Sequence, residues 1–243
     1  MDFVSNFQIK AQSIKRYEGN PYVEGDNIAE HLSRVSRLLI CLAPQLKAEF
    51  SNYPTLIEDI AVCLLVHDDD EVIDGGDIPT AFKAHNVKDE EEIAKFRVSV
   101  DSLPDSVREF LTVAFISFRK KDVLSAKIAK ALDNISGNQL VIEQEIGLIN
   151  PDQAKFSIEY VSKVKGISKT LDVVAEAQIR QIVEFRKYLK LHPGDVGDLL
   201  DSMGIEDSSE KKELLMKVKG LLEIDVVSHP LDRNKINVSL QGL

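Results

Sequence analysis

The chain has 243 residues, of which 44% are apolar, and it carries a formal net charge of −10. This length supports one large domain, or a domain with an appendage, around a real hydrophobic core. The negative charge argues against broad contact with nucleic acid or with an anionic membrane, and no apolar run is long enough to span a bilayer.

The first half of the chain predicts helices separated by turns. Apolar residues recur at helical spacing over 3–17 and again in a helix that runs to about residue 46. Asp26 or Asn27 can cap that second helix, and Glu30 lies three residues after Asn27, as in a capping box. A third helix begins near Pro54 and becomes apolar almost all round before it reaches His67. A helix of that kind lies at the centre of a fold.

The second half also favours helices, and the strand signal is weak throughout. Further helices are predicted over 88–98, 104–118, 123–136, 151–165, 168–191 and 208–223. Gly137 is expected to stop the helix that precedes it. Residues 194–210 indicate a loop or a short helix, and the stretch from Asp225 onward is expected to be extended, as a hairpin or a disordered tail.

Other residues give weaker signals. The start, MDFVSNFQIK, has no basic region followed by an apolar block, so we expect no signal peptide and a cytoplasmic protein. Cys41 and Cys63 each lie in an apolar helical stretch, which indicates buried thiols and not a disulfide. The remaining histidines and the acids near residue 70 are expected to be surface or turn residues: Asp69, Asp70, Asp74, His85, His192 and His229.

Four polar residues stand where apolar helices predict inward-facing side chains. His67 and Asp68 follow the central helix directly, and Glu71 lies one helical turn beyond His67 on the same face. His31 adjoins the apolar stripe of its helix, and Asp133 shares a strip with small alanines. Two imidazoles and two carboxylates form a ligand set suited to one divalent metal ion (Mn, Co, Mg, Zn, Fe or Ni), which would acidify a bound water and polarise a P–O bond. Without such an ion, four costly groups would lie on inward faces with no common purpose.

The order H…HD…D on helices resembles the HD-domain metal-dependent phosphohydrolases. Arg16-Tyr17, which begins fifteen residues before His31, and the strings HDDDEVIDGGDIPT and KALDNISGN are similar to the 5′-deoxynucleotidase (YfbR-like) branch. The resemblance covers roughly residues 5–140 well. It implies an all-α fold, with an HD-domain helical bundle over residues 1–192 and a C-terminal helical extension of unknown role over 193–243.

The resemblance also implies a role for each site residue. One divalent metal ion would be held by His31, His67, Asp68 and Asp133. Glu71 would hold or deprotonate the attacking water, and Asp77 would contact the ester oxygen and assist the leaving group. Arg16 would grip the phosphate, and Tyr17, which stands where close relatives have tryptophan, would pack on the nucleoside.

These residues favour hydrolysis of (deoxy)nucleoside 5′-monophosphates to nucleoside and phosphate. A nucleoside triphosphate hydrolase or another HD phosphohydrolase is the alternative, but three phosphates need more cations than Arg16, Lys83, Lys127 and Lys130. An alternative of another class is a non-catalytic helical interaction protein with a structural metal. The expected partner is a small phosphorylated substrate, with no nucleic acid and no membrane, and analogy with relatives raises a homodimer.

Overall fold

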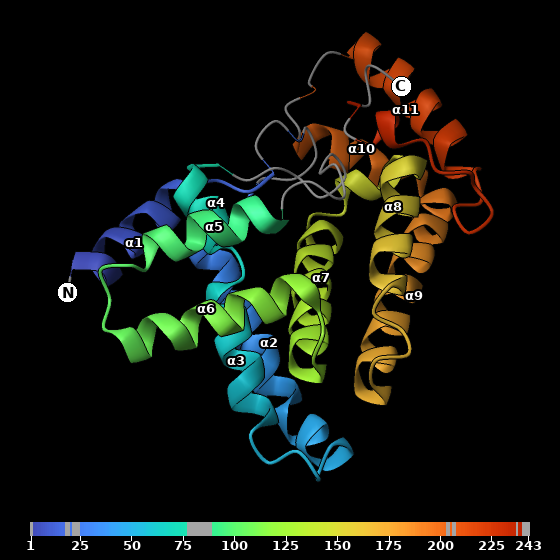
Figure 1. The fold of residues 1–243 in the computed structure, drawn as a ribbon. Helices are drawn as coiled ribbons and strands as arrows, with labels where there is room; N and C mark the ends of the chain where they lie inside the picture. Colours follow the sequence, from blue (N-terminus) through green and yellow to red (C-terminus); the bar gives the residue numbers. More distant parts are fainter. Residues whose placement is uncertain are drawn as a thin grey trace. The chain divides into compact units, whose positions relative to one another are not determined.

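The computed structural model describes residues 2–17, 20, 25–76, 89–202, 205, 208–236, 238 and 239. In these residues the secondary structure is helical, apart from an isolated antiparallel bridge between Lys15 and Asn27 (Figure 1). The predicted all-α fold class is therefore confirmed. No helix in this part of the chain combines the length and the apolar character needed to cross a bilayer.

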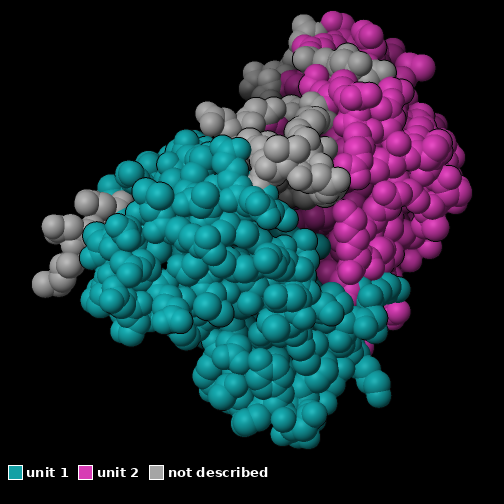
Figure 2. Space-filling model, in the orientation of Figure 1, with its two compact units in different colours: residues 1–18, 25–137, 165–172 teal, residues 19–24, 138–164, 173–243 magenta. Residues whose placement is uncertain are grey.

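The chain forms two compact units (Figure 2). The first contains residues 1–18, 25–137 and 165–172, and the second contains residues 19–24, 138–164 and 173–243. The predicted boundary between a phosphohydrolase domain and an extension at residue 192 stays a prediction.

The first unit is built from the helices of the N-terminal half. They are α1 (Asp2–Ser13), α2 (Ile28–Glu49), α3 (Leu56–Val66), α4 (Asp69–Asp74), α5 (Asp89–Ser99), α6 (Asp105–Lys120) and α7 (Leu124–Gln144) up to Gly137. α3 packs against both α2 and α6, as its apolar circumference predicts. Phe96 of α5 and Phe115 of α6 stack with ring centroids 4.2 Å apart in the same core. Burial of an aromatic ring of this size contributes about 1.5–3 kcal/mol.

α2 follows the predicted pattern closely. The Asn27 side chain accepts a hydrogen bond from the Glu30 backbone, and the Glu30 carboxylate accepts one from the Asn27 backbone, which completes the capping box. Ile28, Val35 and Leu39 are buried along one face. Cys41, expected to be buried, is exposed because it lies off this face. The expected burial of Cys63 is confirmed.

The N-terminal helix is shorter than predicted. α1 ends at Ser13, and the next residues pair with the segment that leads into α2. The Arg16 backbone N–H donates to the Asp26 carbonyl at 2.8 Å, and the Ile28 N–H donates to the Ile14 carbonyl at 3.2 Å. These bonds satisfy backbone groups that a longer helix would have used internally, so Arg16 lies on a pinned turn.

The predicted helix stop at Gly137 is wrong. α7 continues through Gly137 to Gln144. A Cβ atom added at Gly137 would lie 3.1 Å from the Tyr17 hydroxyl oxygen, which also lies 3.4 Å from the Gly137 carbonyl oxygen. The glycine therefore provides a close approach for Tyr17 and does not end the helix.

The second unit holds the C-terminal part of α7 and the later helices. They are η1 (Ile146–Ile149), α8 (Pro151–Ser162), α9 (Lys169–Leu191) from residue 173, α10 (Pro193–Ser202), α11 (Ser208–Leu222) and η2 (Arg233–Lys235). The short-helix option for residues 194–210 is confirmed by α10.

The stretch after Asp225 is neither a hairpin nor an unstructured tail in its described residues. It forms turns and η2, and its polar groups bind to α8 and the residue before it. Asn150 donates to the Lys235 carbonyl at 2.8 Å, and His229 lies 3.0 Å from the Asp152 carboxylate. His229, expected to be a surface or turn residue, thus belongs to this contact.

A buried arginine organises the same unit. Arg186 of α9 donates through Nη1 to the carbonyls of Leu148 and Ile149, at 2.5 and 2.7 Å. Through Nη2 it donates to the carbonyls of Leu221 and Ile224, at 2.6 and 3.4 Å. Burial lowers the Arg186 pKa to about 10. The guanidinium therefore joins η1 to the end of α11 through neutral acceptors.

Candidate metal centre

Four predicted ligands lie together in the first unit. His31 comes from α2, His67 and Asp68 from the junction of α3 and α4, and Asp133 from α7, and all are buried. The His31 Nε2 atom lies 3.2 Å from the His67 Nε2 atom and 3.1 Å from Asp133 Oδ1. Asp68 Oδ2 lies 3.2 Å from His67 Nε2. The ligand atoms of His31, His67 and Asp133 all lie within 4.8 Å of one another, as divalent metal ligands do, and Asp68 Oδ2 adjoins them at 3.7 Å from His31 Nε2.

The His67 ring is oriented by α3 and α6. Its Nδ1 atom lies 2.7 Å from the Leu64 carbonyl oxygen, which can only accept, so Nδ1 is the donor. The ring also packs against Phe118 at a centroid distance of 5.2 Å. This arrangement leaves Nε2 facing the other ligands, as in metal sites where the second ring nitrogen binds a carbonyl.

Lys130 holds the other oxygen of the Asp133 carboxylate. Lys130 lies one turn before Asp133 on α7, and its Nζ atom donates to Asp133 Oδ2 at 2.5 Å. The same Nζ atom lies 5.6 Å from the Phe118 ring centroid. Asp133 Oδ1 therefore faces His31 and His67. Lys130 is therefore engaged by a candidate ligand, although its sequence position made it a candidate phosphate cation.

The charges around the centre shift the two histidines in opposite directions. Burial alone would lower the His67 pKa, but Asp68 and Asp133 raise it well above its ordinary value. Burial and the nearby Arg16 guanidinium lower the His31 pKa. The metal-free centre thus carries a proton on His67 at neutral pH, between two carboxylates.

Metal binding is therefore expected to release at least one proton at neutral pH, because the His67 Nε2 atom must be deprotonated to become a ligand. Below the raised His67 pKa, the apparent affinity should fall by about tenfold for each unit of pH. Calorimetric titration of metal into the metal-free chain, in buffers of different ionisation enthalpy, measures the released protons. A binding heat independent of the buffer would contradict this prediction.

Arg16 lies beside the centre with unused donors. Its Nε and Nη1 atoms are buried and have no hydrogen-bond partner among the residues that the structure describes. Burial alone would lower the Arg16 pKa, but Asp68, Tyr17, Asp133 and Glu71 raise it above its ordinary value. A permanently charged guanidinium with free donors next to a metal centre suits a phosphate group.

The backbone around Arg16 is unusually constrained. A Cβ atom added at Gly25 would lie 1.6 Å from the Arg16 carbonyl oxygen, so only glycine fits there. Tyr17 has a φ of 58°, a left-handed conformation that is costly for a tyrosine. Its ring centroid lies 5.6 Å from the Arg16 guanidinium carbon. The turn thus holds Arg16 and Tyr17 side by side.

Replacing Gly25 with alanine is expected to displace the Arg16 turn. We expect a loss of about 1–3 kcal/mol in the free energy of unfolding from overpacking, and a weaker affinity for inorganic phosphate. Chemical denaturation and phosphate titration measure the two effects. Gly220→Ala is the matched control, since nothing lies within 4 Å of its added Cβ. Equal behaviour of the two variants would show that Gly25 does not hold the turn.

The prediction that the acids after Asp68 are surface residues is wrong for two of the three. Asp69 and Asp70 are buried, and Asp74 alone of the three is exposed, where it binds Lys95 at 2.9 Å. Glu71 is buried in the same short helix, α4. An ionised carboxylate buried at Asp70 requires a compensating cation.

Arg119 provides that cation, and the sequence reasoning missed it. It forms an ion pair with Asp70 of α4 and a second with Glu92 of α5 at 3.0 Å. Its guanidinium also lies 5.2 Å from the ring centroid of Phe115, one helical turn earlier on α6. Its position four residues after Phe115, on the same face of the helix, was the sequence signal that Arg119 points inward. We call Arg119, Asp70 and Glu92 the ionic triad, which joins α4 to α5 and α6.

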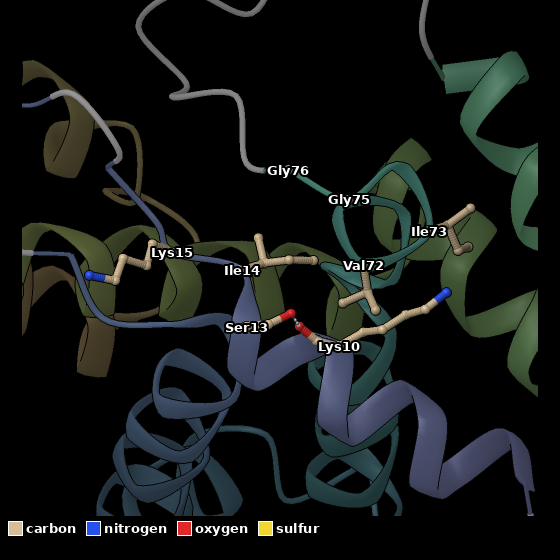
Figure 3. Close-up of a pocket in the computed structure, with 8 residues that line it drawn as sticks. All are labelled: Lys10, Ser13, Ile14, Lys15, Val72, Ile73, Gly75 and Gly76. Atoms are coloured by element: carbon tan, nitrogen blue, oxygen red, sulfur yellow. Dashed lines mark hydrogen bonds between the residues drawn. The ribbon is translucent and has the colours of Figure 1, made fainter.

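A cavity of about 410 Å³ adjoins α4 (Figure 3). It is lined by Lys10, Ser13, Ile14 and Lys15 near the end of α1, and by Val72, Ile73, Gly75 and Gly76. Figure 3 shows the two lysine side chains extending away from each other, so they form no single anion site. Asp77, the remaining predicted site residue, comes directly after Gly76 in sequence and lies outside the described residues.

Comparison with known proteins identifies the family of the chain. The family model described as 5′-deoxynucleotidase YfbR-like matches residues 5–182, well beyond residue 140. A crystal structure described as a predicted metal-dependent phosphohydrolase from Magnetospirillum magnetotacticum MS-1 is similar, with 21% identity and a TM-score of 0.60. The similarity covers 76% of this chain and 91% of that one, and it supports the fold. No curated protein matches the chain. The chain therefore belongs to the YfbR-like 5′-deoxynucleotidase family and is a metal-dependent phosphohydrolase.

Proposed function

We propose that this phosphohydrolase acts on (deoxy)nucleoside 5′-monophosphates and releases nucleoside and orthophosphate. The observation that carries the proposal is the Arg16 guanidinium beside the candidate ligands, because its Nε and Nη1 atoms are buried without a hydrogen-bond partner among the described residues. The family's description as 5′-deoxynucleotidases supports the same substrate class.

In the proposed site, the divalent ion is held by His31, His67, Asp68 and Asp133. When bound, such an ion supplies an acidified water and a Lewis acid for a phosphoryl oxygen. Glu71, buried one turn beyond His67, accepts the proton of the attacking water. Arg16 binds the phosphate and neutralises its charge. Lys130 keeps the Asp133 carboxylate oriented through Oδ2.

The leaving-group side of the proposal rests on family resemblance. Asp77 contacts the ester oxygen and assists departure of the nucleoside. Tyr17 packs on the nucleoside, and its position next to Arg16 supports this role. Neither role needs a residue outside the matched range of 5–182.

A monophosphate is favoured over a triphosphate because few cations are available near the centre. Lys130 is bound to Asp133, and Lys127 is exposed on α7. Lys83 lies outside the described residues. A triphosphate would bring several negative charges to the site, whereas the Arg16 guanidinium is the cation proposed to neutralise them.

The test is phosphate release from a panel of nucleoside mono- and triphosphates. It uses chelated protein reloaded with Mn, Co, Mg or Zn, and the Asp68→Ala variant as a control. We expect orthophosphate from monophosphates, abolished in the control. Release of triphosphate would transfer the assignment to a triphosphohydrolase, and no release from any nucleotide would refute the nucleotidase proposal.

We further propose a cytoplasmic location and a homodimer. Cys41 and Cys63 are both unpaired, which fits a reducing compartment. α6 leaves Val107, Phe110 and Val113 exposed at helical spacing, and an apolar stripe of this kind supports self-association. The mass of the chain in solution, from sedimentation equilibrium, tests the second proposal.

A further inference from the structure

A second cavity, separate from the metal centre, lies in the second unit. It has a volume of about 510 Å³ and is formed by the end of α9, the start of α10 and one face of α11. Its lining residues span 189–222, so it falls entirely outside the range matched by the family model. We call it the α9–α11 groove. The proposed nucleotidase chemistry uses none of its residues.

The groove is apolar over its floor and wall. Leu189, Val196 and Leu222 are buried beneath it. Leu191 and Met216 line it with 75% and 73% of their surface exposed. Two large apolar side chains left to water around a concavity mark a binding surface more often than chance exposure. Methionine is also suited to this, because its flexible thioether adapts to different ligands.

Cations border the apolar surface. Lys212 and Lys219 lie on the same face of α11 as Met216, at spacings of four and three residues. Neither lysine makes an ion pair with any residue that the structure describes, whereas Lys190 at the same groove is bound to Glu223 at 2.5 Å. A chain of net charge −10 thus keeps two uncompensated cations beside an apolar hollow.

We propose that the α9–α11 groove binds a free anionic amphiphile, meaning a single hydrocarbon chain with a carboxylate or phosphate head. The hydrocarbon chain lies along Leu189, Leu191 and Met216, and the head group meets Lys212 and Lys219. The volume falls in the range of small-molecule sites, about 300–1,000 Å³. The overall negative charge disfavours an anionic bilayer as the source, because a membrane surface would face the whole chain and not two lysines alone.

The test uses a tryptophan reporter. The chain contains no tryptophan, so Met216→Trp places the sole indole in the groove while keeping it apolar. Dodecanoate and dodecyl phosphate are added below their micelle concentrations, with dodecyltrimethylammonium as the cationic partner of equal chain length. We expect a saturable blue shift with the anions and an affinity about tenfold or more weaker for the cation. Calorimetry with dodecanoate and the unmodified chain repeats the measurement without the substitution.

Charge reversal gives the decisive comparison. The Lys212→Glu/Lys219→Glu variant should lose about tenfold or more in dodecanoate affinity. The Lys187→Glu/Lys235→Glu variant has the same change in net charge outside the groove and should stay within about twofold. Equal effects of the two variants, equal affinity for the cationic amphiphile, or no saturable signal would each overturn the proposal.

Vesicles distinguish the source of the ligand. Binding to phosphatidylglycerol vesicles without binding to monomeric dodecanoate would overturn the proposal in favour of membrane docking. All these readouts are binding measurements in the absence of nucleotide, so failure here leaves the proposed nucleotidase function untouched, and the reverse also holds.

Discussion

Glu71→Gln is expected to lower kcat by about 10²–10⁴-fold while the chain still binds its metal ion with unchanged stoichiometry. Glu71 is buried in α4, one helical turn from His67, and it is proposed as the general base and not as a metal ligand. The amide preserves the shape of the side chain but cannot take a proton from water. Turnover and bound metal are measured on the same preparation.

The matched control for this substitution is Asp74→Asn. It makes the same kind of change on the same helix, at an exposed residue that binds Lys95. We expect wild-type kcat for that variant. If Glu71→Gln also kept wild-type kcat, Glu71 would not be the general base, and a metal centre acting as a structural staple would regain support.

Asp70→Asn and Asp69→Asn are expected to differ sharply although the substitutions are identical and adjacent. Asp70→Asn leaves the partly buried Arg119 with Glu92 as its remaining carboxylate in the ionic triad. Breaking a buried ion pair by removing one partner costs about 3–5 kcal/mol. Because α4 carries Glu71, kcat should fall as well. Denaturant unfolding and kcat are measured for both variants.

Asp69→Asn should cost little, because the Asp69 carboxyl already holds a proton near neutral pH. Burial, with Asp68 and Asp70 nearby, raises its pKa to about 8 in the metal-free chain. The unfolded chain releases this proton at about pH 4, so in the wild type the penalty for burying the group grows as pH rises from about 4 to about 8. The variant has no such penalty, and its Tm relative to wild type should rise over that window.

Melting curves of the metal-free proteins between pH 5 and pH 8 check this sign. A Tm difference that stays constant with pH would mean that Asp69 is ionised throughout. Equal destabilisation of the two variants would mean that the ionic triad does not depend on Asp70 in particular.

Residues that recur at helical spacing were predictable from sequence, and those that depend on tertiary neighbours were not. His31, His67, Asp68 and Asp133 were found because each adjoins an apolar helical stripe, and a stripe fixes which way a side chain points. Four polar side chains that point into one core are expected to lie close together. The metal roles themselves stay predictions.

The misses share a physical cause. The local sequence pattern predicts that Asp70 is a solvated turn residue, whereas the ion pair with Arg119, 49 positions later, offsets the cost of burying its carboxylate. A glycine at position 137 is typical of a helix stop, but here it leaves room for the Tyr17 hydroxyl, which lies 120 positions earlier in the sequence. Such pairings have no periodicity along the chain, so no window of sequence contains them.

Arg186 has a consequence for how the second unit is completed during synthesis. A ribosome adds about 5–20 residues each second, and folding can begin behind it. The guanidinium acceptors at Leu221 and Ile224, and the Lys235 carbonyl that receives Asn150, are made last. Until they emerge, Arg186 and Asn150 have donors without their final acceptors. The residues of the first unit end at 172, so all of its proposed metal ligands have been synthesised while the remainder of the nascent chain is still being extended.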